Sequence, residues 1–186
     1  SATIAEGEVL QLTAAQDLRT DESVYLQVVR GKTAALFSAA TEVGAVIAGA
    51  PEAQVKGLRD YGDALGIAFQ IADDVLDYGG NSTVIGKNTG DDFRERKLTL
   101  PVIHAVSKAD GDERAFWTRV IEKGEQRPED LDRAMAMLTA HGSIDYARES
   151  ARTWAARAQA ALFIFPESDL RKTLAELADF VVKRVL

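Results

Sequence analysis

The chain has 186 residues, a formal net charge of −7 at pH 7 and no cysteine. An acidic chain argues against nucleic acid as a partner, and the absence of cysteine excludes a disulfide framework, thiol catalysis and a thiolate metal site. We expect no signal peptide, because the N-terminal residues lack a basic region, and no transmembrane segment, because no run reaches about 18 apolar residues. A reducing compartment, the cytoplasm, fits the missing cysteines.

Helical patterns account for nearly the whole chain, because the alternation typical of β-strands is almost absent. The expected helices cover residues 2–15, 22–48, 52–78, 98–109, 113–123, 128–141, 144–163 and 167–186. A chain of this length can form one domain with a substantial core. The sequence therefore predicts an all-α bundle with its functional site between helices.

Short polar segments mark where these helices begin and end. Residues 16–20 are expected to form a loop, and Thr20 or Asp21 is expected to cap the helix that follows. Ser143 is expected to cap a later helix in the same way. Residues 81–97 are rich in glycine and charge, so this segment is expected to be a loop.

One apolar helix carries three carboxylates. Asp73, Asp74 and Asp77 form a DDxxD pattern, and helix geometry makes them neighbours on one face, together with Gln70. Acidic clusters are common on solvated helix faces, so the pattern alone is a weak signal. Here it lies inside an apolar run, where three adjacent carboxylates would repel one another unless a hard divalent cation offset the cost. All candidate ligands are oxygens, which favours magnesium, with Asp73 as the first choice for a direct ligand.

The loop after this helix carries cations suited to a phosphate. Lys87 has glycines nearby, so its backbone can approach phosphate oxygens closely, and Lys97 lies at the end of the loop. The same residues are also compatible with a solvated charge run. Asp91 and Asp92 either add contacts around a metal or simply balance the lysines.

The segment FQIADDVLDY, followed by GKNTGDDFRERKLTLP, resembles the second aspartate-rich motif and following loop of the trans-type (all-E) polyprenyl diphosphate synthases. The chain as a whole is most similar to the long-chain branch, which makes octaprenyl to decaprenyl diphosphates. The resemblance covers residues 1–186 but only the C-terminal portion of a family member, because the first aspartate-rich motif is not in this sequence. We therefore expect part of a single isoprenoid synthase domain without its N-terminal helices. Alone, such a part is expected to be inactive and to expose a large apolar face.

The resemblance implies a prenyltransferase that condenses isopentenyl diphosphate with allylic diphosphates. Its product would be a long-chain all-trans polyprenyl diphosphate, a precursor of quinone side chains, formed by ionisation, condensation and elimination. Asp73, Asp74 and Asp77 would share in a cluster of three magnesium ions around the allylic diphosphate. The resemblance also implies a homodimer and leaves open a peripheral membrane contact for product release.

The resemblance further implies roles for individual side chains. Lys32 would otherwise be an ordinary exposed lysine beside a helix glycine, but the matching Lys-Thr pair of the family, here Lys32 and Thr33, touches the allylic diphosphate. Lys87 and Lys97 would neutralise diphosphate charge. Gln70 would form hydrogen bonds near the reacting carbons or the pyrophosphate.

Two further positions follow from the same comparison. Glu8 and Gln11 lie three residues apart on the first expected helix, and the resemblance places them near the diphosphate region. The family has glycine before its second loop lysine, whereas this chain has Arg96. That departure leaves the backbone turn at Arg96 as an open question.

Two other functions remain as alternatives. The chain could be a non-catalytic partner subunit or a dimer module that keeps the fold while the chemistry occurs elsewhere. It could also be a class I terpene cyclase, which shares the metal chemistry, although the lysine-bearing loop favours chain elongation. Magnesium-dependent diphosphate binding would separate an active subunit from a non-catalytic one.

Overall fold

The computed structural model describes residues 2–79 and 90–185, and every regular element in these two ranges is helical. This confirms the predicted all-α fold. The α-helices are α1 (Ala2–Ala14), α2 (Glu22–Val29), α3 (Ala35–Ile47), α4 (Glu52–Gly79), α6 (Asp91–Arg94), α7 (Leu100–Lys108), α8 (Gly111–Trp117), α9 (Asp130–Ala140), α10 (Ser143–Ala161) and α11 (Asp169–Lys183). Two π-helical segments, Arg30–Ala34 and Thr118–Glu122, and one 3₁₀ turn, Leu162–Ile164, complete the set.

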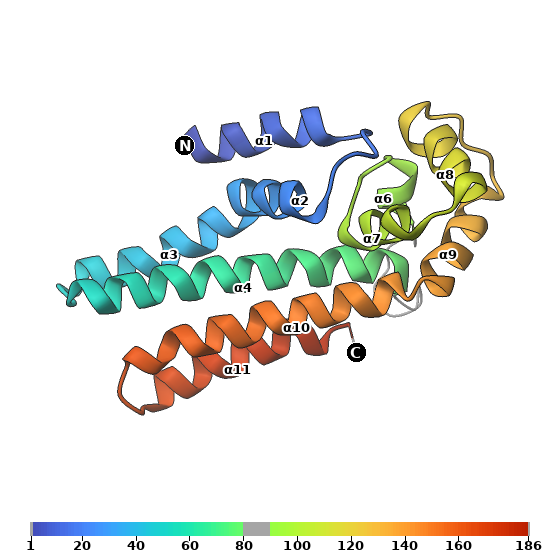
Figure 1. Ribbon diagram of the computed structural model, residues 1–186. Helices are drawn as coiled ribbons and strands as arrows, with labels where there is room; N and C mark the ends of the chain where they lie inside the picture. Colours follow the sequence, from blue (N-terminus) through green and yellow to red (C-terminus); the bar gives the residue numbers. More distant parts are fainter. Residues whose placement is uncertain (1, 80–89, 186) are drawn as a thin grey trace.

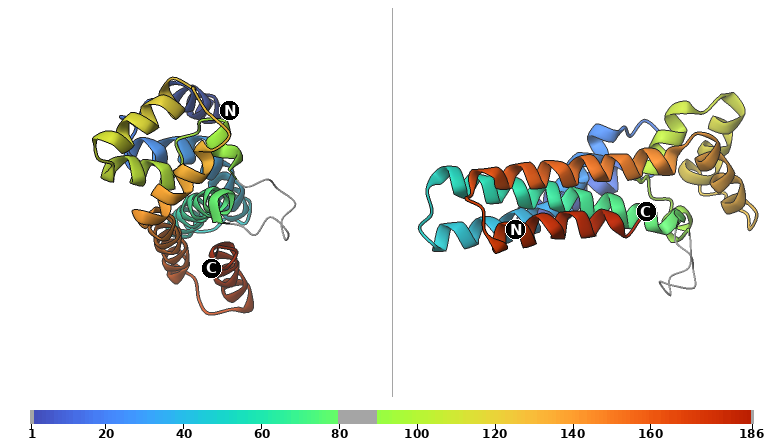
Figure 2. Two further views of the ribbon diagram at one scale, coloured as in Figure 1. Left: turned by 90° about the vertical axis from the view of Figure 1, so that its right-hand side faces the viewer. Right: turned by 90° about the horizontal axis from the view of Figure 1, so that it is seen from below.

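Helix α4 is the axis of the molecule. Figures 1 and 2 show α3 and α10 running along α4, α11 against α10, and helices α6 to α9 gathered at one end. Pro51 precedes α4 and Glu52 opens it with an acidic first turn, which suits the positive end of the helix dipole. Its middle is buried on all sides, with residues 64–68 buried without interruption, as expected of a helix at the centre of a bundle.

The buried apolar side chains form two clusters. The larger one follows α4 and is completed by α2, α10 and α11, with Ile67 and Ile71 fully buried near its centre. The smaller one lies under α7, α8 and α9 around Trp117. The C-terminal half of α4 is therefore surrounded by packed side chains, and Asp74 is buried among them.

Glycines on α4 allow another backbone to come unusually close. A Cβ added to Gly62 would lie 2.3 Å from the hydroxyl oxygen of Thr41 on α3, and one added to Gly66 would lie 2.6 Å from the Cα of Ala34. Such separations are far below van der Waals contact. The π-helical segment is thus pressed against α4 next to the acidic motif.

The long helix expected over residues 22–48 is present but is not uniform. It starts as predicted, with the Asp21 side chain accepting a hydrogen bond from the Val24 amide. At Arg30–Ala34 the turn widens to a π-helix before α3 continues. Gly31, the poorest helix former of that stretch, lies within the widened turn.

Three other expectations need correction. The loop expected over residues 81–97 contains the short helix α6. Ser143 does not cap α10: it is the first helical residue, fully buried, and its hydroxyl lies 2.9 Å from Nδ1 of His104. Helix α8 starts two residues early, because the Asp110 side chain accepts hydrogen bonds from two amides of its first turn.

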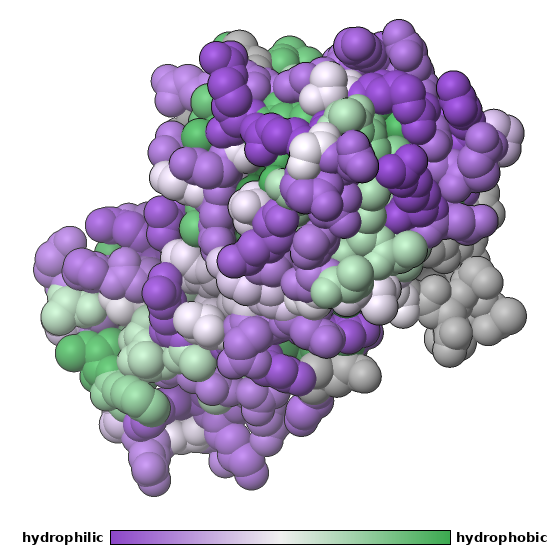
Figure 3. Space-filling model, turned by 45° about the vertical axis from the view of Figure 1, so that its right-hand side comes forward, coloured by the Kyte–Doolittle hydropathy of each residue, from purple (hydrophilic) through white to green (hydrophobic). Residues whose placement is uncertain are grey.

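Large exposed apolar side chains fall mainly into two sets. One set lies on α1 and α3: Val9, Leu12, Leu36, Val43, Val46 and Ile47. The other lies on the 3₁₀ turn and α11: Phe163, Ile164, Leu170, Leu177 and Phe180. On the face shown in Figure 3, hydrophilic residues predominate and a hydrophobic patch lies at the lower left. Within residues 2–79 and 90–185, no helix has both the length and the apolar character to cross a membrane.

Candidate functional site

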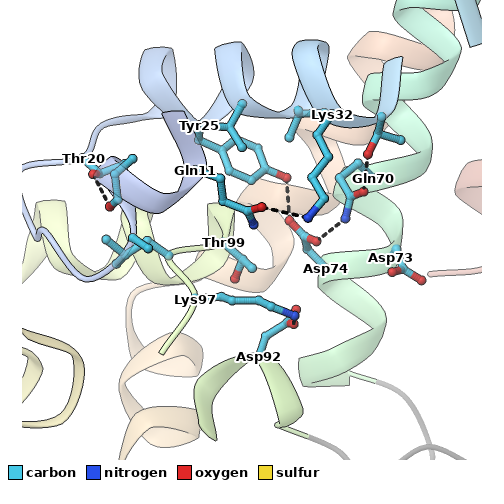
Figure 4. Close-up of a pocket in the computed structure, with 16 residues that line it drawn as sticks. Gln11, Thr20, Tyr25, Lys32, Gln70, Asp73, Asp74, Asp92, Lys97 and Thr99 are labelled. Atoms are coloured by element: carbon cyan, nitrogen blue, oxygen red, sulfur yellow. Dashed lines mark hydrogen bonds and ion pairs between the residues drawn. The ribbon is translucent and has the colours of Figure 1, made fainter. Parts of the chain in front are cut away.

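A pocket of about 180 Å³ opens beside the acidic motif of α4. Figure 4 shows its polar lining converging from α1, α2, α4 and the segment between α6 and α7. Six of the residues expected from the sequence line it: Lys32, Thr33, Gln70, Asp73, Asp74 and Lys97. Side chains up to 65 positions apart therefore meet in one cavity, with both acids and amines present.

A chain of hydrogen bonds crosses the wall of the pocket from α2 to α4. The Thr33 hydroxyl donates to Oε1 of Gln70 over 2.9 Å, and Nε2 of Gln70 donates to Oδ1 of Asp74 over 2.8 Å. The hydroxyl of Tyr25 donates to the other carboxylate oxygen, Oδ2, over 2.6 Å. Both oxygens of Asp74 are thus held by neutral donors.

Asp74 is the most perturbed acid of the motif. Its residue exposure is only 5%. Burial is the main cause that raises the pKa of Asp74 to about 7; the charges of Asp92 and Asp73 act in the same direction, and the hydrogen bonds from Tyr25 and Gln70 oppose it. A carboxyl group with a pKa near 7 in a cavity is typical of a functional site.

The other two acids of the motif have different surroundings. Asp73 lines the pocket and is only partly buried, so its carboxylate is open to a ligand. Asp77 instead accepts hydrogen bonds from the backbone amides of Asp91 and Asp92, at 3.2 and 3.0 Å, and thereby holds the start of α6. Burial raises the pKa of Asp77, and the Asp92 amide bond opposes this effect.

Lys32 lines the pocket and is held by α1, which packs directly on the π-helical segment. Its ammonium donates to Oε1 of Gln11 over 2.8 Å and lies 3.3 Å from Oε1 of Glu8. A Cβ added to Gly7 of α1 would lie 2.8 Å from the carbonyl carbon of Gly31, so only glycine permits this contact. The structure therefore places Gln11 in the pocket lining and Glu8 beside Lys32.

Lys97 approaches from the opposite wall. Its ammonium forms ion pairs with Asp92 at 3.0 Å and Glu95 at 2.7 Å. Burial lowers the pKa of Lys97, but the hydrogen bonds to Glu95 and Asp92 outweigh it and raise the pKa above its ordinary value. Asp92 thus balances a lysine, one of the two roles considered for it. Lys87 lies outside the residues that the structure describes.

The backbone at Arg96 answers the question left by the sequence. Arg96 has φ of +59°, in the left-handed region that glycine adopts most easily. The turn expected of a glycine is therefore made by arginine. The turn precedes Lys97, which it delivers to the pocket.

The fit of a metal ion can be judged from the donors that line the pocket. Among the described residues, no group of three or more His, Cys, Asp or Glu side chains is arranged to hold a metal. The pocket offers instead one open carboxylate, Asp73, together with the buried Asp74 and with Asp92, which is paired with Lys97. This oxygen-only set fits a hard divalent cation whose remaining ligands come from phosphate, water or other chain segments.

Sequence reasoning missed two residues of the pocket. Tyr25 lies seven residues before Lys32 on the same helical path, so spacing alone could have placed both on one face. Thr99 lines the pocket, and its buried hydroxyl lies beside the buried hydroxyl of Tyr78. No sequence signal distinguishes it, because a threonine before a helix normally uses its hydroxyl as a cap.

Comparisons with known proteins agree with this geometry. The family model described as Polyprenyl synthetase matches residues 1–138. The octaprenyl diphosphate synthase of Haemophilus influenzae is 45% identical over 97% of this chain and 55% of its own length. The all-trans-nonaprenyl-diphosphate synthase (geranyl-diphosphate specific) of Rhodobacter capsulatus is 42% identical over 98% of this chain and 55% of its own length.

Solved structures of polyprenyl synthases have the same fold as this chain. A decaprenyl diphosphate synthase from Rhodobacter capsulatus superposes with a TM-score of 0.94 at 66% identity, over 100% of this chain and 57% of that one. A polyprenyl synthase from Caulobacter crescentus, complexed with calcium and isoprenyl diphosphate, superposes with a TM-score of 0.93 at 49% identity, over 100% of this chain and 56% of that one. The chain spans slightly more than half the length of these relatives.

Proposed function

Because the chain belongs to the polyprenyl synthetase family, we propose that it is the C-terminal portion of a prenyltransferase that condenses isopentenyl diphosphate with allylic diphosphates. The proposed product is a long-chain all-trans polyprenyl diphosphate, since similar proteins make octaprenyl, nonaprenyl and decaprenyl diphosphates. One observation carries the proposal: Lys32, Lys97 and Asp73 line a single pocket. Two amines and an open carboxylate suit a diphosphate accompanied by a metal ion.

Magnesium is the proposed metal, with Asp73 as its direct ligand on this chain. The related Caulobacter protein, complexed with calcium and isoprenyl diphosphate, supports a divalent cation beside a diphosphate. When bound, magnesium would supply Lewis-acid stabilisation of the charge that develops on the leaving pyrophosphate. Asp74 and Asp77 contribute to the metal site indirectly, by positioning the residues around it, since both carboxylates already accept hydrogen bonds from donors of the chain.

The side chains of the pocket provide the rest of the proposed chemistry. The ammonium groups of Lys32 and Lys97 are partly exposed, so they can turn from their present partners to phosphate oxygens. Thr33 and Gln70 orient the allylic diphosphate, and the lysines stabilise the pyrophosphate as it leaves. The double bond of isopentenyl diphosphate then attacks the allylic cation. The pyrophosphate takes the proton released in the elimination, and repetition lengthens the product.

The experiment is incubation of a full-length protein that contains this chain with labelled isopentenyl diphosphate, an allylic primer and magnesium, followed by sizing of the products. We expect all-trans chains of octaprenyl to decaprenyl length. Cyclised products would favour a terpene cyclase. Magnesium-dependent binding of pyrophosphate without turnover would indicate a non-catalytic subunit. The resemblance also supports a homodimer in the cytoplasm.

A further inference from the structure

A hydrogen bond from Tyr25 connects helix α2 to the acidic motif of α4. Tyr25 lies on α2, its ring is buried among the core residues, and its hydroxyl donates to Asp74 of α4, 49 residues away, over 2.6 Å. In Figure 4 the ring of Tyr25 stands behind the pocket with its hydroxyl directed at Asp74. A hydrogen bond to a carboxylate is among the stronger kinds in proteins.

The consequence of this bond extends beyond Asp74. With Oδ2 held by Tyr25, the other oxygen of Asp74 faces Gln70 and accepts from its Nε2. A carboxylate can only accept from Gln70, so the amide must turn its own oxygen to the Thr33 hydroxyl, as observed at 2.9 Å. The orientation of Gln70 and Thr33 at the pocket therefore depends on a fixed Asp74.

We propose that Tyr25 is a positioning residue for the reaction, acting through Asp74 to hold Gln70 and Thr33 in the orientation that receives the metal-bound diphosphate. This inference rests on the proposed function of the pocket. Without the phenol hydroxyl, Oδ2 of Asp74 has no donor in a buried position, and the carboxylate is free to rotate away from Gln70. The amide of Gln70 then loses the partner that determines which of its ends faces Thr33.

Tyr61 provides a matched control on the same bundle. Its ring is also buried in the larger core cluster, and its hydroxyl donates to the carbonyl oxygen of Leu174 over 2.9 Å. That bond joins α4 to α11 and is outside the pocket lining. Tyr61→Phe therefore removes one buried phenol hydrogen bond without touching the proposed chain.

The test compares Tyr25→Phe with Tyr61→Phe in a full-length protein that contains this chain. Thermal unfolding, calorimetric titration with pyrophosphate in the presence of magnesium, and steady-state kinetics are measured for each. We expect both variants to remain folded, with a larger loss of thermal stability in Tyr25→Phe, because its hydroxyl donates to a buried carboxylate and that of Tyr61 to a neutral carbonyl. Only Tyr25→Phe should weaken magnesium–pyrophosphate binding, by about tenfold, and lower kcat with it.

Two outcomes would overturn the inference. The first is binding and kcat by Tyr25→Phe within about twofold of the unsubstituted protein, well below the expected tenfold change. The second comes from the pair Tyr25→Phe and Thr33→Val: losses that add fully would show that Tyr25 does not act through the chain ending at Thr33. Unsubstituted protein that neither binds magnesium pyrophosphate nor elongates a primer would instead refute the proposed function, so the two failures are distinguishable.

Discussion

Replacing Asp74 with asparagine tests the electrostatics of the site directly. Burial raises the pKa of this carboxyl from 3.8 to about 7. Between these values the folded protein keeps a proton that the unfolded chain has released. Stability from this group is therefore present at low pH and is lost as pH rises from about 4 to 7.

The size of the effect follows from the shift. A rise of about 3 pKa units corresponds to about 4 kcal/mol at 1.36 kcal/mol per unit. Asparagine has the same shape, carries no charge, and can still accept the hydrogen bond from Tyr25 through its amide oxygen. Its amide nitrogen cannot accept the hydrogen bond from Gln70, so the full value is an upper bound. Asp74→Asn is therefore expected to unfold with a free energy up to about 4 kcal/mol larger than the parent protein at about pH 8, and with little difference at about pH 4.

The assay is urea denaturation of full-length protein at several pH values, in buffer with a chelator so that metal binding does not contribute. Asp73→Asn is the control, because Asp73 is only partly buried and faces the pocket. It should change the free energy of unfolding little at any of these pH values. A loss of stability by Asp74→Asn at about pH 8 would refute the reasoning, since it would mean that the buried carboxylate stabilises the fold.

Substitutions of Asp77, Thr99 and Gly7 give three further expectations. Asp77→Asn should keep more of the elongation activity than Asp77→Ala, because its amide oxygen can still accept one of the two hydrogen bonds from the α6 backbone; equal losses in turnover assays would point to direct metal ligation instead. Thr99→Val should lower the free energy of unfolding by about 1 kcal/mol, because it removes the polar neighbour of the buried Tyr78 hydroxyl; an unchanged or higher value in urea denaturation would show that the two hydroxyls do not interact. Gly7→Ala should weaken magnesium–pyrophosphate binding in calorimetry, because the added Cβ would meet the backbone at Gly31 and displace α1 from Lys32. Gly44→Ala is the control: there is open space around Gly44, so binding should be unchanged. Equal binding by the two variants would contradict this expectation.

The sequence was sufficient to predict most of the helices and six of the polar side chains that line the pocket. Apolar periodicity located α4, and the DDxxD spacing placed Asp73 and Asp74 on its pocket side. Lys32 and Lys97 were proposed from the resemblance, and the structure brings both to the same cavity. These features are encoded locally or in motifs, so a single chain reveals them.

Other features depend on contacts between distant residues. The bond from Tyr25 to Asp74 spans 49 positions, and no local pattern indicates it. Helix α6 is only four residues long, too short to produce a periodic signal, so the tie between Asp77 and its amides was not foreseen. The π-helical turn at Arg30–Ala34 depends on packing against α1 and α4, which propensity does not describe.

The central claim is that Asp73 of α4, together with Lys32 and Lys97, holds a metal-bound diphosphate in the pocket. Calorimetric titration of pyrophosphate into full-length protein, with and without magnesium, tests this claim most directly. We predict that pyrophosphate binds only when magnesium is present, and that Asp73→Ala abolishes this binding without lowering thermal stability. Equally tight binding in the absence of magnesium, or unchanged binding by Asp73→Ala, would contradict the account.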